Sequence, residues 1–164
     1  MGKQAKLFWV VILSTIGWII LMRPFTPGNI VQFELAKSIE SAQGIIDAWG
    51  DEGVAKARIG IYLDFVFILL YTWAIRLGCQ LSAAFSENER LIAVGAFFSR
   101  AIVFAGSCDL IENVAMLFTL DGMNELTVSM AFYFAVFKFS VVAAALMLIV
   151  ISLAVGAGKI VLKK

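Results

Sequence analysis

The sequence predicts an all-α integral membrane protein, a four-helix bundle with an additional amphipathic helix between the first and second spans. Of its 164 residues, 62% are hydrophobic and only 15% are charged, whereas about a quarter of the residues of a soluble domain are charged. The apolar residues also occur in four blocks close to the length of about 20 residues that crosses a bilayer. We therefore expect a single transmembrane domain over residues 1–164, with the lipid bilayer as its surroundings.

The first predicted span covers about residues 7–22 and contains no charged residue. Its length and its two tryptophans differ from the core of a signal peptide, and no cleavage pattern of small residues follows it. We therefore expect this span to be retained. Pro24 and Pro27 are the only prolines in the chain, and they should end the helix.

An amphipathic helix is predicted over about residues 30–49. Asn29 is placed as its N-cap, with Gln32 completing a capping box, and Gly50 follows its last turn as a C-terminal glycine. One apolar stripe with a 4-3-4-3 spacing is formed by Leu35, Ile39, Ala42, Ile46 and Trp49. Two placements remain open: the helix lies on the membrane surface, or it folds over the ends of the spans as a lid.

The other three spans are predicted at about residues 59–79, 91–120 and 127–155. A polar connection over residues 80–90 separates the second span from the third, and an acidic turn over residues 121–125 separates the third from the fourth. The third span is longer than one bilayer thickness and must tilt or protrude.

Basic residues predict the orientation. Lys3 and Lys6 precede the first span, Arg90 lies in the second connection, and the turn between the last two spans has no basic residue. The chain ends with Lys159, Lys163 and Lys164. By the positive-inside rule, both termini are expected on the cytoplasmic side of the membrane. The membrane itself is expected to be the inner (plasma) membrane of the cell. A net charge of +1 without a basic tract argues against nucleic acid as a partner.

The chain has no histidine, which removes the commonest general base and a common metal ligand. We therefore predict no catalytic residue and no cofactor. Cys79 and Cys108 are expected near opposite ends of their helices, as two buried thiols without a disulfide.

The third span carries the most informative polar group. Asp109, Glu112 and Asn113 are spaced i, i+3 and i+4, so they share one helix face. Ionisable groups at membrane depth usually face a bundle interior or a water-filled cavity. In the predicted topology Asp64 lies roughly 8 Å into the second span, at 1.5 Å per residue, level with this face. Lys138 in the fourth span can reach it.

Glu34 of the amphipathic helix, or Arg58 at the outer mouth, could join this cluster from above, whereas Arg100 lies on the opposite face from Asp109. Pairing Lys138 with one acid leaves at least one carboxylate over, which either keeps its proton or holds a cation. An aromatic pocket around Tyr62, Tyr71 and Tyr133 is a further expectation. The predicted ligand-binding residues are Glu34, Asp64, Tyr71, Asp109, Glu112, Asn113 and Lys138; whether a metal binds stays open.

Several short runs carry a resemblance to a known group of proteins. They are Phe33-Glu34-Leu35-Ala36, then Leu63-Asp64-Phe65 with Phe67 and Tyr71, then Asp109-x-x-Glu112-Asn113. With these runs the chain resembles small uncharacterised bacterial four-span integral membrane proteins over most of its length. The resemblance implies the four-helix layout and marks the acids and Asn113 as positions of interest, but it implies no reaction.

Three functions follow as hypotheses. The first is a small membrane protein with an outward-facing acidic pocket that binds a cation, a proton or an amphiphilic ligand, in a role related to transport. The alternative is a structural or accessory membrane subunit, in which the charged cluster only holds the helices together. A lipid-modifying enzyme is a third, weaker hypothesis. The sequence decides neither the ligand nor the oligomeric state.

Overall fold

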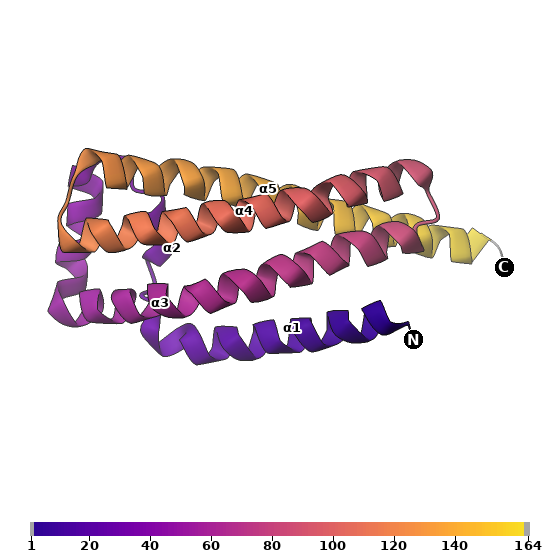
Figure 1. The fold of residues 1–164 in the computed structure, drawn as a ribbon, viewed down its shortest axis with the longest axis horizontal. Helices are drawn as coiled ribbons and strands as arrows, with labels where there is room; N and C mark the ends of the chain where they lie inside the picture. Colours follow the sequence, from indigo (N-terminus) through magenta and orange to yellow (C-terminus); the bar gives the residue numbers. More distant parts are fainter. Residues whose placement is uncertain (1, 163–164) are drawn as a thin grey trace.

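A computed structural model describes residues 2–162, and these residues contain α-helices and one 3-10 turn but no strand. Figure 1 shows long helical stretches lying side by side, with a short stretch across one end. In chain order the elements are α1 (Lys3–Met22), the 3-10 turn η1 (Arg23–Phe25), α2 (Ile30–Glu34), α3 (Ile39–Phe85), α4 (Glu89–Asp121) and α5 (Glu125–Leu162). The prediction of an all-α chain is therefore confirmed.

Three of these helices are long and apolar enough to cross a membrane: Lys3–Phe25, Glu89–Asp121 and Glu125–Leu162. They contain the predicted first, third and fourth spans. The predicted second span lies within α3, which is not among the three. Many large apolar side chains on the long helices are exposed, including Leu13, Phe104 and Val150. Such apolar surface is typical of helices that face lipid.

Small residues and one hydrogen bond bring the long helices together. Gly106 of α4 faces Thr72 of α3 so closely that an added Cβ would lie 2.6 Å from the threonine hydroxyl oxygen. Ala145 of α5 is fully buried against Cys79 of α3. Close approach at small residues is the usual way in which membrane helices pack. On the other side of α3, Trp18 of α1 donates a hydrogen bond of 3.0 Å to a backbone carbonyl of α3.

The predicted continuous helix over residues 30–49 is wrong, because the chain leaves the helical conformation after Glu34 and resumes it at Ile39. Ser38 has an extended backbone, and its hydroxyl accepts a hydrogen bond from the Ser41 backbone N–H. It therefore begins a new helix. The break allows both Phe33 and Ala36 to be buried, at 3% and 4% exposure.

Asn29 occupies the N-cap position of α2 without a capping hydrogen bond from its side chain, so the predicted capping box is also wrong. Its carboxamide oxygen instead accepts a hydrogen bond from the indole N–H of Trp49. Gly50 does interrupt the helix, as predicted, with φ of 60° and ψ of −176°. That conformation is accessible essentially only to glycine, and it lets the chain turn into the long part of α3.

The segment before Gly50 folds over one end of the long helices (Figure 1). Four members of the predicted apolar stripe, Ile39, Ala42, Ile46 and Trp49, belong to or pack against a core that includes Ile61, Met116 and Val128. Leu35, the fifth member, is 38% exposed because it lies in the break. Of the two placements left open by the sequence, the structure therefore has the segment packed as a lid.

The remaining boundaries differ only at the ends of the helices. α3 continues to Phe85 and α4 begins at Glu89, where the Asn88 carboxamide accepts hydrogen bonds from two backbone N–H groups. The predicted polar connection over residues 80–90 therefore shrinks to three residues. α5 runs on to Leu162, beyond the predicted end near residue 155. Lys163 and Lys164, used above for the orientation, lie outside the described residues.

Candidate functional site: an acidic cluster around Lys138

The site is centred on Lys138, which extends from the middle of α5 into the interior and is only 7% exposed. Its ammonium nitrogen lies 2.8 Å from a carboxylate oxygen of Asp109 and 2.9 Å from one of Glu112, both on α4. A third carboxylate oxygen, from Glu34 of α2, lies 3.4 Å away. Asp109 and Glu112 are 2% and 0% exposed, so this is a buried ionic cluster formed by three separate helices.

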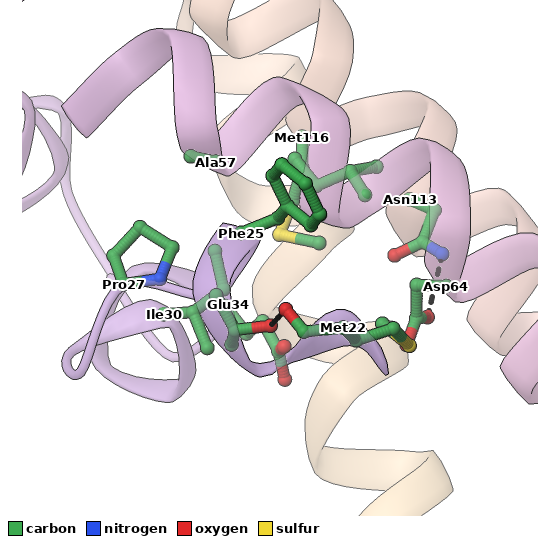
Figure 2. A pocket seen from close by; sticks show the side chains of 12 residues that line it. Met22, Phe25, Pro27, Ile30, Glu34, Ala57, Asp64, Asn113 and Met116 are labelled. Carbon is green, nitrogen blue, oxygen red and sulfur yellow. Dashed lines mark hydrogen bonds between the residues drawn. The ribbon is translucent and has the colours of Figure 1, made fainter. Parts of the chain in front are cut away.

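Two further contacts extend the cluster to α3. The Tyr71 hydroxyl donates a 2.7 Å hydrogen bond to the second carboxylate oxygen of Asp109. The Asn113 carboxamide donates a 2.8 Å hydrogen bond to Asp64, which Figure 2 shows as a dashed line. The shared helix face of Asp109, Glu112 and Asn113 therefore faces both neighbouring helices, as the i, i+3, i+4 spacing predicts. Five of the seven predicted ligand-binding residues are therefore joined by direct contacts with Lys138 or Asp109. The other two, Asp64 and Asn113, form a hydrogen-bonded pair of their own, and Asp64 lines the same cavity as Glu34, Asp109 and Lys138. These seven residues are called the network below.

Negative charge exceeds positive charge in the network. It contains the four carboxyl groups of Glu34, Asp64, Asp109 and Glu112 and a single ammonium group. One buried oxygen of Glu34 and one of Glu112 have no hydrogen-bond partner. The Glu34 oxygen is the one 3.4 Å from Lys138, which is an electrostatic contact without hydrogen-bond geometry. An excess of buried carboxylate is unfavourable unless protons or a cation compensate it.

Glu34 lies outside the long apolar helices, at the end of α2. Burial raises the pKa of its carboxyl group above the usual value, and attraction to the Lys138 ammonium opposes that rise. Burial is the larger effect, because removing a carboxylate from water favours its neutral form. Glu34 therefore holds a proton more readily than a carboxyl group in water does.

A cavity of about 340 Å³ lies against this cluster. Glu34, Asp64, Asp109 and Lys138 form its polar wall, with Tyr71 beside them. Its other wall is apolar and includes Phe67, Ile75, Phe139 and Val142. The volume falls in the range of small-molecule sites, in which a few polar groups fix the orientation of a largely apolar ligand.

A smaller cavity of about 50 Å³ lies on the other side of Glu34 and Asp64 (Figure 2). Phe25 and Pro27 of the connection from α1 to α2 cover it, and Ile30 of α2 and Met116 of α4 also line it. Asp64 additionally borders a third cavity between α1 and α3, beside Ile19 and Phe67. Asp64 is therefore the group at which three cavities meet.

Some sequence predictions place residues wrongly in relation to this site. Tyr62 and Tyr133 are 57% and 67% exposed, so of the three predicted tyrosines only Tyr71 lines the cavity. Arg58 does not join the cluster either, because its guanidinium pairs with Asp121 at 2.8 Å. Arg100 lies away from the cluster, as predicted, and lines another cavity. Both cysteines are buried free thiols, also as predicted.

The apolar wall was missing from the sequence prediction, although one signal was available. Phe67 lies three residues after Asp64 and four before Tyr71, so all three share a face of α3. Phe139, whose ring centroid is 4.8 Å from the Lys138 nitrogen, follows that lysine directly and gave no periodic signal. Within residues 2–162, no group of three or more Asp, Glu, Cys or His side chains is arranged to hold a metal ion.

Comparison of the chain with family models, with curated proteins and with solved structures gave no match.

Proposed function

We propose that this protein is a four-span integral membrane protein whose acidic cavity binds a cationic ligand. In this proposal the long part of α3 is the second span and also crosses the membrane, together with α1, α4 and α5. The segment from Gly28 to Gly50 roofs the outward-facing end, and both termini lie in the cytoplasm. The positive-inside pattern supports this orientation, and the resemblance to small bacterial four-span proteins supports the layout.

The observation that carries the proposal is that four carboxyl groups and only one ammonium group lie beside a cavity of ligand size. Two kinds of occupant would compensate the excess negative charge: protons, or the positive group of a ligand. The apolar wall formed by Phe67, Ile75 and Phe139 favours a ligand that also carries a hydrophobic part. A primary ammonium group on an alkyl chain has both features, so we take a cationic amphiphile as the ligand class. Protons occupy the site in its absence.

A role in transport would require the ligand or its proton to leave by a second route. Asp64 borders cavities on three sides, so it is the residue at which such an exchange would take place. Transport, unlike binding, would also require the helices to move.

The proposal predicts that dodecylammonium binds the purified protein in neutral detergent, whereas dodecanol, which has the same chain but no charge, binds much more weakly. Asp64→Asn should weaken dodecylammonium binding about tenfold, because an interaction with a charged group contributes about 1.5–3 kcal/mol. Asp109→Asn should weaken it similarly. Isothermal titration calorimetry measures both affinities.

A matched control is Asp121→Asn, which removes a carboxylate paired with Arg58 far from the cavity lining. Its affinity for dodecylammonium should equal that of the unmodified protein. Equal binding of dodecylammonium by all three variants would contradict the proposal.

The second candidate is a structural subunit, and the contacts of Lys138 with three carboxylates favour it. In that case Asp109→Asn would lower the melting temperature in detergent, and dodecylammonium would bind neither the variant nor the unmodified protein.

A further inference from the structure

A basic cavity of about 440 Å³ lies between α3 and α4, near the short connection that joins them. Arg76 and Gln80 of α3 line one side of it, and Arg100 of α4 lines the other. Its floor is formed by small residues, including Ala83 and Ala96. Among the described residues, no carboxylate lines the cavity. It is therefore separate from the acidic cavity and opposite to it in charge.

The two arginines have no counter-ion within residues 2–162. Neither guanidinium lies within ion-pair distance of a described carboxylate. Arg76 is held over the ring of Trp73, 5.2 Å from its centroid. At 1.5 Å per residue, both arginines lie about 15 Å along their helices from the connection. A cation at such a depth in a membrane protein is costly unless an anion accompanies it.

An apolar groove of about 180 Å³ continues from the basic cavity along the same two helices. Arg76 borders both, and the groove leads past Trp73 and Val103 to Leu69 and Leu110. It therefore leads away from the connection, toward the middle of the long helices. Positive groups at one end and an apolar groove at the other match the two parts of a phospholipid.

We propose that this groove between α3 and α4 binds an anionic phospholipid, with its phosphate between Arg76 and Arg100 and an acyl chain in the groove. The guanidinium group has the donor geometry that suits phosphate oxygens. Basic pockets between membrane helices on the cytoplasmic side are known to hold anionic headgroups. The binding does not depend on the ligand of the acidic cavity.

Native mass spectrometry of the detergent-purified protein tests this, with phosphatidylglycerol and phosphatidylcholine of identical chains as the probes. The unmodified protein should bind one phosphatidylglycerol about tenfold more tightly than phosphatidylcholine. Arg76→Gln/Arg100→Gln should abolish that preference, because the two guanidinium groups repel the trimethylammonium group of phosphatidylcholine, and phosphatidylglycerol has no such positive group beside its phosphate. Arg100→Gln alone, at an exposed position, should reduce it if the double variant does not fold.

The matched control is Arg90→Gln, which removes an exposed arginine at the same end of the molecule that does not line the cavity. It should keep the full preference for phosphatidylglycerol. Equal binding of the two lipids by the unmodified protein would overturn the proposal, as would an equal loss in Arg90→Gln and Arg100→Gln. Inorganic phosphate that displaces the bound phosphatidylglycerol at similar concentration would assign the site to free phosphate and overturn the lipid assignment.

Discussion

Replacing Lys138 with methionine should lower the free energy of unfolding by about 3–5 kcal/mol, the range seen when one partner of a buried ion pair is removed. Methionine has a similar length, so the change removes the charge without leaving a large void. Asp109, Glu112 and Glu34 would then lack the only ammonium group among residues 2–162 that contacts them. Thermal unfolding in detergent measures the effect.

Two further variants show whether charge is the cause. Lys138→Met combined with Glu112→Gln removes one of the orphaned carboxylates and should recover part of the lost stability. Lys56→Met breaks an exposed pair with Glu52 on the same face of a helix, and it should leave the melting temperature unchanged, because exposed pairs contribute little. A melting temperature for Lys138→Met equal to that of the unmodified protein would show that the lysine does not neutralise the cluster.

Gly60→Ala should have the second-largest effect, a loss of about 1–3 kcal/mol, typical of an extra methyl group in a tightly packed site. A Cβ at position 60 would lie 2.5 Å from the backbone carbonyl oxygen of Phe25. Since that contact is with backbone, the connection between α1 and α2 must shift. The connection covers the small cavity beside Asp64 and leads to Glu34 (Figure 2), so dodecylammonium affinity should fall as well.

Gly17→Ala is the control for this substitution. Gly17 lies within α1 and an added Cβ would meet no atom within 4 Å. Alanine in an open helical position should leave the stability unchanged or raise it by less than about 1 kcal/mol. Equal melting temperatures for the two alanine variants would refute the packing assigned to Gly60.

The long helices could be predicted from the sequence because length and hydrophobicity decide them. Prolines after Met22 and the acidic turn after Leu120 mark real ends of helices. The break between Glu34 and Ile39 was not predictable from periodicity, since Leu35 continues the apolar spacing across it. There, the burial of Phe33 and Ala36 against the ends of the other helices prevails over the helical pattern.

The charged residues of the site could also be predicted from the sequence for a physical reason. Asp64, Asp109 and Lys138 interrupt apolar blocks, where charges are costly and seek one another. Arg58 lies just before the second predicted span, so its position did not show that it pairs with Asp121 at the end of α4 and not with the cluster. The apolar wall of the cavity could not be found in this way, because Ile75 and Phe139 resemble every other apolar residue of a membrane helix.

Carbodiimide labelling is the sharpest test of whether carboxyl groups from separate helices line one ligand cavity. A membrane-permeant carbodiimide reacts with protonated carboxyl groups in apolar surroundings, and mass spectrometry of the digested protein locates the adduct. We expect an adduct on Glu34 or Asp64, which line the cavity, with Glu112, which is 0% exposed, left unmodified. Dodecylammonium should prevent that adduct. Labelling confined to exposed acids such as Glu40, or labelling of the cavity acids that dodecylammonium does not reduce, would contradict it.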